Sequence, residues 1–424
     1  MIISKVNQTY LLYLVLLGFF GLDIINFGAL DLLYMALVLF LAYPTIRSKG
    51  AYPQMIRWYV AFVFISCLYS WAINQQNLFH VTVRSYDYFA LLSFFFLLQT
   101  DLSSNETLRV LELLALTFCI GYFIQWLVYP TLIFSMADIN SDAETTKYRA
   151  RMVGSLLSYF LLIYSVNRLL LQREWKYILY GTLGFIPIIL QGFRSMMFLT
   201  VFAVFAMIPF VLRSVKKSVL YSLIGIGVAL IAVSNSLVQA KMDEMIGRQE
   251  RNQTFTNDDY IRWLSLDYYW NQQFTKPLEK ILGGGKPSDL KSKYVKEINR
   301  ARLEYHFFWT DLGLVGLSMI IGMPAVILLV LMYIRCIWRC KAPPIQFVRF
   351  TFFIVLIGSL FVNSELYRKG NILLLSLFLY YEYKYHEEKK VAEVKSRKLR
   401  YSRFIIKKYL KELRSNENRN TYLS

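Results

Sequence analysis

The sequence predicts an all-α polytopic membrane protein with about twelve transmembrane helices and one large, partly helical extracytoplasmic loop. Hydrophobic residues make up 56% of the 424 residues and charged residues only 18%, a balance outside the usual range of soluble globular domains. Apolar runs recur along most of the chain, and many approach the roughly 20 residues that a helix needs to cross a bilayer. One long polar stretch, residues 241–306, interrupts them.

Twelve apolar runs are expected to be the membrane spans. They occupy residues 10–25, 28–46, 57–73, 85–99, 110–135, 152–171, 176–191, 195–212, 218–238, 307–334, 346–363 and 370–385. The first two runs are kept apart because Asp23, Asn26 and Asp31 bring too much polarity for one helix. We therefore expect nine spans, the loop, three further spans and a basic tail, at residues 1–240, 241–306, 307–385 and 386–424.

The placement of basic residues predicts the orientation of the chain. Lysine and arginine gather in alternate connections, as at Arg47, Arg173 and Arg339, and the tail from Lys384 holds 13 basic against five acidic residues. The positive-inside rule then puts both termini in the cytoplasm and the long loop outside. The formal net charge of +19 lies between apolar runs and in the tail, so it suits anionic lipid headgroups and not nucleic acid.

The long loop is expected to form a folded cap. Its 12 basic and 10 acidic residues nearly balance, Asp258–Phe274 has a helical pattern, and Gly283–Gly285 indicates a tight turn. A phosphate-binding loop running into Lys286 is not predicted, because the first glycine and the Ser/Thr of that motif are missing. The four cysteines all lie outside the loop, in or beside apolar runs, and no histidine accompanies them. Neither a metal site nor any other cofactor is predicted.

Three arginines mark a candidate anion site at the outer face. Arg194 lies between two apolar runs, Arg151 opens another helix from the same side, and Arg262 lies in the loop beside Trp263. An arginine held near lipid usually has an anionic partner, and its planar guanidinium suits phosphate oxygens. Each arginine taken alone also fits a helix end or a surface ion pair. Together, on one face, they favour a substrate that carries a pyrophosphate.

The mouth of the span that follows the loop carries three candidate general bases. Glu304, His306 and Asp311 follow one another there, and any of them could accept a proton if it is shielded from bulk water. A histidine at a helix mouth also fits a structural role. The sequence does not rank the three.

Four stretches, taken in order, resemble motifs of the O-antigen polymerase and O-antigen ligase superfamily of bacterial membrane glycosyltransferases. They are Arg151–Gly154, Gly192–Ser195, the segment from Arg262–Trp263 through Pro277 to Gly283–Gly285, and Asp311–Leu317. The likeness covers roughly residues 150–330, and the first 150 residues match only in hydropathy. Phe193 stands where the family usually has a small residue.

One departure from the family pattern bears on the kind of enzyme. Ligases of the family carry a histidine about eleven residues before the first glycine of the last motif, whereas His306 is seven residues before Gly313 and Arg302 holds the eleventh position. His306 could still point the same way on a helix, since four residues make about one turn. The missing His-Asn pair favours a polymerase over a ligase.

The resemblance implies a polymerase that joins undecaprenyl-pyrophosphate-linked oligosaccharide units into O-antigen, capsule or exopolysaccharide at the outer face of the bacterial cytoplasmic membrane. Arg194 and Arg262, with Arg151 or Arg302, would neutralise the pyrophosphate, and Trp263 and Asp311 would help to bind substrate. A loop carboxylate such as Glu304, or His306, would receive the proton of the acceptor hydroxyl. Membrane lipids, a chain-length regulator and a flippase are the partners that this function implies.

Three other functions stay open. A ligase would use the same donor and a lipid A core or protein acceptor. A flippase or exporter of the lipid-linked unit would carry charges or broken helices deep in its spans, whereas the ionisable residues here lie near span ends, as at Asp23, Asp31, Asp87 and Glu112. A sensing or scaffold protein would not need the arginine-bearing motifs.

Overall fold

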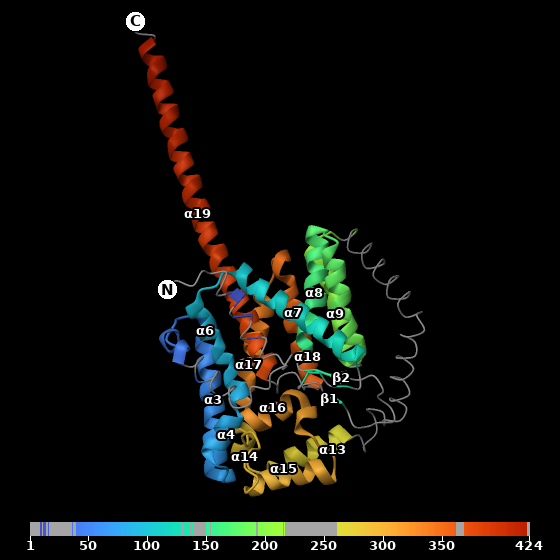
Figure 1. Cartoon of the computed structure of the whole chain (residues 1–424). Coiled ribbons are helices and arrows are strands. Elements are labelled where there is room, and N and C mark those ends of the chain that lie inside the picture. Colours follow the sequence, from blue (N-terminus) through green and yellow to red (C-terminus); the bar gives the residue numbers. More distant parts are fainter. Residues whose placement is uncertain are drawn as a thin grey trace.

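The computed structural model describes a helical bundle with a cap at one end and a long helix that leaves the other end (Figure 1). In the part of the chain that it describes, one short antiparallel pair, β1 (Asp138–Ile139) with β2 (Ala150–Arg151), accompanies the helices. The described residues are 9–10, 12–13, 16, 36, 40–128, 131, 133–134, 138–139, 150–152, 154–191, 194–214, 216, 261–361 and 369–421.

Apolar helices of membrane-crossing length support a multi-pass membrane protein. Among the described residues, four pass the test of length and composition: α3 (Ala51–Asn74), α7 (Ser104–Leu127), α8 (Ser155–Gln172) and Pro343–Leu360, the last made of η5 (Pro343–Ile345) with most of α18 (Gln346–Phe361). A fifth arises if two helical segments bent by 54° count as one span: α4 (Leu78–Arg84) and Tyr86–Thr100, which is α5 (Tyr86–Phe89), η2 (Ala90–Leu92) and α6 (Ser93–Thr100).

Other expected spans are shorter apolar helices or parts of longer ones. They are α9 (Lys176–Gln191), α10 (Arg194–Leu212), α17 (Met323–Arg339) and the first part of α19 (Lys369–Thr421). The expected spans at 10–25, 28–46 and 218–238 lie wholly or mostly outside the described residues.

The expected single span at 307–334 is instead broken. It consists of η4 (Trp309–Leu312), α16 (Gly313–Ile321) and α17, with Gly322 between the last two. Gly322 has φ +86, a conformation that ends a helix readily only at glycine, and Pro324 in the first turn of α17 has no N–H with which to continue α16. The break could not be seen in the hydropathy pattern, because one glycine and one proline hardly lower the mean hydropathy of an apolar run.

Local signals set several helix ends. The Asn77 side chain accepts a hydrogen bond from the His80 N–H (3.2 Å) at the start of α4. Left-handed residues terminate α3, α6 and α8, at Gln75, Asp101 and Arg173. These helices therefore have defined ends without help from a connecting segment.

The first part of α19 is the central helix of the bundle. Residues Ile372 to Tyr381 are buried on all faces. Around this helix, the Phe378 ring packs edge-on against Phe160 (ring centroids 5.1 Å apart) and Phe352 (6.1 Å). A helix that is apolar on every side needs such an all-round partner set, which explains why this span lies inside the bundle.

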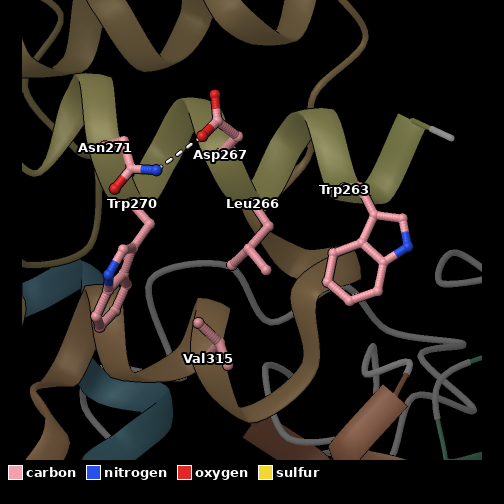
Figure 2. A pocket seen from close by; sticks show the side chains of 6 residues that line it. All are labelled: Trp263, Leu266, Asp267, Trp270, Asn271 and Val315. Carbon is pink, nitrogen blue, oxygen red and sulfur yellow. Dashed lines mark hydrogen bonds between the residues drawn. The ribbon is translucent and has the colours of Figure 1, made fainter. Parts of the chain in front are cut away.

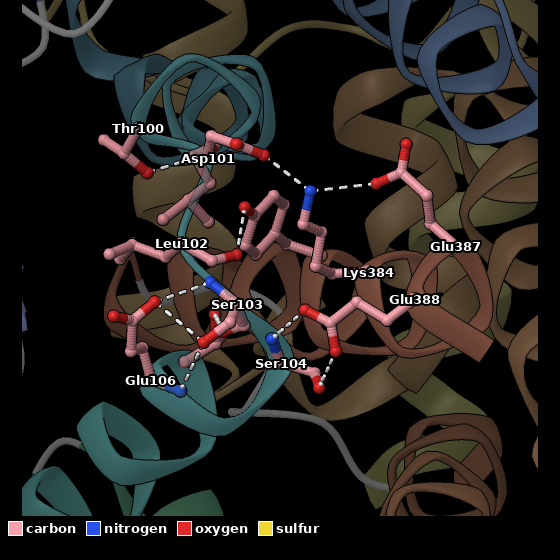
Figure 3. A network of polar contacts seen from close by, with 12 residues as sticks. Thr100, Asp101, Leu102, Ser103, Ser104, Glu106, Lys384, Glu387 and Glu388 are labelled. Atoms are coloured by element: carbon pink, nitrogen blue, oxygen red, sulfur yellow. Dashed lines mark hydrogen bonds and ion pairs between the residues drawn. The ribbon is translucent and has the colours of Figure 1, made fainter. Parts of the chain in front are cut away.

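A polar network fixes α19 where it leaves the bundle (Figure 3). The Glu388 carboxylate accepts hydrogen bonds from the Ser104 N–H (2.9 Å) and hydroxyl (2.5 Å) at the start of α7. Lys384 bridges Asp101 (2.5 Å) and Glu387 (2.9 Å). Beyond this network α19 continues to Thr421 as an extended basic helix, at the opposite end of the bundle from the cap (Figure 1).

Candidate functional site

The cap consists of the short helices before the broken span and the first short helix of that span. They are α13 (Ile261–Asp267), the π-helical η3 (Tyr268–Gln273), α14 (Pro277–Leu282), α15 (Lys293–Glu304) and η4. The helical pattern expected at Asp258–Phe274 corresponds to α13 and η3 from Ile261 onward, and residues 241–260 lie outside the described part of the chain.

The cap has a hydrophobic core of its own, which rests on the bundle. Tyr269, Phe274, Tyr294 and Ile298 are buried together, and this cluster also includes Met319 of α16. Burial raises the pKa of the Tyr294 phenol well above its ordinary value, and its hydroxyl donates to the Gly285 carbonyl (3.1 Å). The cap is thus a folded unit seated on α16.

The triple glycine joins the cap to the break in the span, and the expected tight turn there is wrong. Residues 283–288 have no turn or helix assignment. The Gly284 and Gly285 N–H groups donate to the carbonyls of Met319 (2.7 Å) and Ile320 (3.1 Å) at the end of α16. Carbonyls at a helix end lack partners within the helix, so the glycine segment provides N–H donors to both of them.

Glycine is required in this segment because the main chains approach so closely. A Cβ on Gly283, whose φ is +78, would lie 2.6 Å from the Gly322 nitrogen and 2.8 Å from the Ile320 oxygen. The Gly284 carbonyl in turn accepts from the side chains of Ser70 (2.5 Å) and Asn74 (3.2 Å) at the end of α3. The segment therefore ties α14, α16 and α3 together.

An ion pair strengthens the same junction. Lys286 is paired with Asp87, and both side chains are largely buried. Asp87 lies at the bend between α4 and α5, not at the end of a straight span as the sequence suggested. Lys286, the lysine that a phosphate loop would use, therefore pairs with a carboxylate of the bundle instead.

A groove opens between the cap and α16 (Figure 2). It has a volume of about 460 Å³ and is lined by Trp263, Leu266, Trp270, Asp267, Asn271 and Val315. The side chains of Trp263, Leu266 and Trp270 point from α13 and η3 toward Val315, whereas the Asp267 carboxylate points away from it (Figure 2). Trp263 is 57% exposed and Val315 39%. The groove thus presents apolar groups on both walls.

The polar residues at the rim of the groove are paired with each other. The Asn271 amide donates to the Asp267 carboxylate (2.7 Å), and Gln272 reaches the other carboxylate oxygen (3.5 Å). On its other side, Trp270 receives the Lys280 ammonium over its ring, 5.1 Å from the centroid. Sequence reasoning identified Trp263 and missed Trp270, although both lie on the same helical face seven residues apart.

The structure brings the main chains of several expected site residues to the capped end of the bundle. Near the start of α10, which begins at Arg194, Met196 packs against Gly358 of α18. Gly313, two residues after Asp311, lies against the Ser359 carbonyl in the next residue of α18. The start of α10, at Arg194, and the start of α16, two residues after Asp311, therefore lie beside the same turn of α18.

Arg151 and Arg262 belong to elements of the same end. α13, which carries Arg262 and Trp263, packs against η4, which carries Asp311. Arg151 does not open a helix as expected, because β2 contains it and α8 begins only at Ser155, after Gly154 with φ +105. Figure 1 shows β2 at the end of the bundle where α13 and α16 lie. The side chains of Arg151 and Arg194 lie outside the described part of the structure.

Three other expected site residues are exposed in and after α15. Glu304 is paired with Arg300 one turn earlier (2.7 Å), and the Arg302 guanidinium lies over the Phe308 ring, 5.8 Å from its centroid. His306 has φ +55 and follows the end of α15. It therefore lies off the helix, so the argument that it points the same way as a residue one turn earlier is wrong. His306 is the left-handed residue that follows the end of α15.

Glu279 is a buried carboxylic acid that sequence reasoning did not single out. It is only 6% exposed, in α14 beside the end of α3. Burial raises the pKa of Glu279, and a hydrogen bond from the Asn74 side chain and the charge of Lys276 oppose this shift. Its position after Pro277 and Leu278 gave no signal of burial, since only the packing of the cap on α3 removes it from water.

Among the described residues, no group of three or more histidine, cysteine, aspartate or glutamate side chains is placed to hold a metal ion.

Comparison with known proteins gives no family. No protein-family profile matches the chain. No curated protein sequence matches it either.

Proposed function

We propose that the protein is a membrane glycosyltransferase that polymerises oligosaccharide units carried on undecaprenyl pyrophosphate, at the outer face of the bacterial cytoplasmic membrane. The proposal rests on the four motifs that resemble the O-antigen polymerase and ligase superfamily. The observation that carries it furthest is that Arg194, Arg262 and Asp311, which belong to three of these motifs, lie on elements at the same capped end of the bundle.

The proposed orientation, with both termini in the cytoplasm, rests on the positive-inside rule and is supported by the same arrangement. The basic tail and the cap are at opposite ends of the bundle (Figure 1). A tail with 13 basic and five acidic residues is retained in the cytoplasm, so the cap faces outward, where lipid-linked units are polymerised. Both termini are then cytoplasmic.

The chemistry needs little beyond charge and position. The bond between sugar and pyrophosphate is already activated, so guanidinium groups that receive the developing charge of the leaving pyrophosphate accelerate the transfer. Arg194 and Arg262 take that role. An acceptor hydroxyl attacks the anomeric carbon and passes its proton to a carboxylate or imidazole of the cap. Asp311 is better placed for this than Glu304, because its element, η4, contacts the helix that carries Arg262, whereas Glu304 lies at the exposed end of α15.

The test is substitution of the two arginines in a host that makes the polymer. Arg194→Ala and Arg262→Ala are expected to lower polymerisation about 100-fold or more, as loss of one charge-stabilising donor does in other enzymes. Arg300→Ala, an exposed cap arginine paired only within α15, is the matched control and should leave polymer length unchanged. Normal polymer in both Arg194→Ala and Arg262→Ala would refute the pyrophosphate role.

The product that accumulates separates polymerase from ligase. After loss of a polymerase, single repeat units reach the surface. After loss of a ligase, full-length polymer stays on the carrier lipid. The second result would replace the proposed function with the ligase function.

A further inference from the structure

The proposed chemistry gives no role to the groove between the cap and α16. Its walls come from two parts of the molecule: the indoles of Trp263 and Trp270 from the cap, and Val315 from an apolar helix of the bundle. Val315 is partly exposed on that helix, so the groove opens at the level where the polar cap meets an apolar helix of the bundle. Tryptophan is enriched at this level of membrane proteins because its ring is apolar and its N–H is polar.

The polarity of the groove decides what kind of molecule fits it. The apolar side chains point into it, whereas the Asp267 carboxylate points away from it and accepts a hydrogen bond from the Asn271 amide (Figure 2). A sugar needs several donors and acceptors around its hydroxyl groups, whereas the side chains that point into the groove are apolar apart from the indole N–H groups of the two tryptophans. A hydrocarbon chain needs only apolar walls. A carboxylate at the rim also disfavours a pyrophosphate at that point, which leaves the headgroup toward the Arg262 side of α13.

We infer that the groove holds a stretch of the polyprenyl chain of the lipid carrier and guides its pyrophosphate toward the capped end of the bundle. This inference rests on the proposed function for the identity of the lipid. At about 460 Å³ the groove is of the size of a small-molecule site, so it takes a few isoprene units and leaves the rest of the chain in the bilayer. The cap then selects its substrate by the lipid as well as by the sugar.

The experiment measures lipid binding directly. The full-length protein in phosphatidylcholine nanodiscs is titrated with undecaprenyl phosphate, and bound copies are counted by native mass spectrometry. Trp263→Ala and Trp270→Ala each remove one apolar wall and are expected to weaken binding about tenfold, and Val315→Trp fills the groove and is expected to abolish binding there. Trp338→Ala removes an indole that is 70% exposed on α17, away from the cap, and is the matched control.

Two further arms identify the occupant. Phosphatidylglycerol in place of undecaprenyl phosphate should bind equally to wild type and Val315→Trp, and a difference between them would mean that the groove takes any acyl chain. A lipid-free oligosaccharide released from the host polymer should bind wild type and the Trp263→Ala protein equally. Weaker binding of that oligosaccharide to the variant would show a saccharide subsite and overturn the inference.

Failure of this inference differs from failure of the proposed function. If Val315→Trp and the tryptophan variants bind undecaprenyl phosphate and polymerise as wild type does, the groove has no role, whatever the arginines do. If Val315→Trp loses binding while Arg194→Ala and Arg262→Ala still polymerise normally, the groove binds polyprenyl lipid and the arginine chemistry is wrong.

Discussion

Gly283→Ala tests whether the glycine segment holds the cap on the broken span. The added Cβ would lie 2.6 Å from the Gly322 nitrogen and 2.8 Å from the Ile320 oxygen. Both are main-chain atoms at the α16–α17 break, so they cannot rotate away as a side chain could. The main-chain conformation of Gly283, φ +78 and ψ 159, lies in a region essentially confined to glycine and costs alanine about 1–3 kcal/mol, and overpacking adds about 1–3 kcal/mol.

The two costs together, about 2–6 kcal/mol, weaken the contact between the cap and the bundle. The expected result is that the Gly284 and Gly285 amides, which donate to Met319 and Ile320, exchange with solvent about 30- to 20,000-fold faster, because each 1.4 kcal/mol is a factor of ten. Hydrogen–deuterium exchange of the purified protein in detergent measures this. Exchange in α7 and α8, on the other side of the bundle, should not change.

Gly181→Ala is the matched control. A Cβ at Gly181 in α9 would meet the Ser165 Cβ at 3.6 Å, an ordinary contact, and alanine favours a helix by about 0.5–1 kcal/mol over glycine. This variant should be as stable as wild type or slightly more so. If Gly283→Ala exchanges no faster than Gly181→Ala, the close approach does not hold the cap in place and the reasoning fails.

Two more perturbations probe the same junction. Lys286→Met leaves the Asp87 carboxylate buried without its cation and should lower stability by about 3 kcal/mol. The double variant Asp87→Asn/Lys286→Met should recover most of this loss, measured by thermal unfolding. A double variant no more stable than Lys286→Met would contradict this expectation. Because burial raises the pKa of Glu279 above its ordinary 4.5, the folded state favours the protonated acid, so its contribution is present below pH 4.5 and is lost as the pH rises through the folded value. Glu279→Gln should therefore be more stable than wild type at pH 8 and equal at pH 4, and a difference independent of pH would contradict the assignment.

The helices could be predicted from the sequence because apolar runs and short breakers act locally. The runs at 57–73, 152–171 and 346–363 each correspond to a helix of the bundle, and the pattern at Asp258–Phe274 to α13 and η3. The break at Gly322 was missed because a glycine inside an apolar run changes hydropathy very little. Only the carbonyls of Met319 and Ile320, and the Gly284 and Gly285 N–H groups that meet them, show why it exists.

The site was less predictable because its parts meet through packing between distant segments. Trp263 was found from its neighbour Arg262, but the pairing of its helical face with Val315 depends on how α13 lies over α16. The ion pair of Lys286 could not be predicted for the same reason, since its partner Asp87 lies 199 residues earlier. His306 was expected on a helix, and its φ of +55 could not be inferred from composition.

The broken helices bear on the choice between transfer and transport. A transporter uses breaks within its spans to expose main-chain groups to a cavity that a substrate crosses. Here the carbonyls freed at the α16–α17 break bind the Gly284 and Gly285 N–H groups, and the Ser66 hydroxyl also donates to the Ile320 carbonyl (2.7 Å). The break is therefore filled by protein groups and hydrogen-bonded to the glycine segment of the cap. A break that is filled by protein, next to the elements that carry Arg194 and Arg262 at one end of the bundle, favours the proposed transfer at one face of the membrane over passage through it.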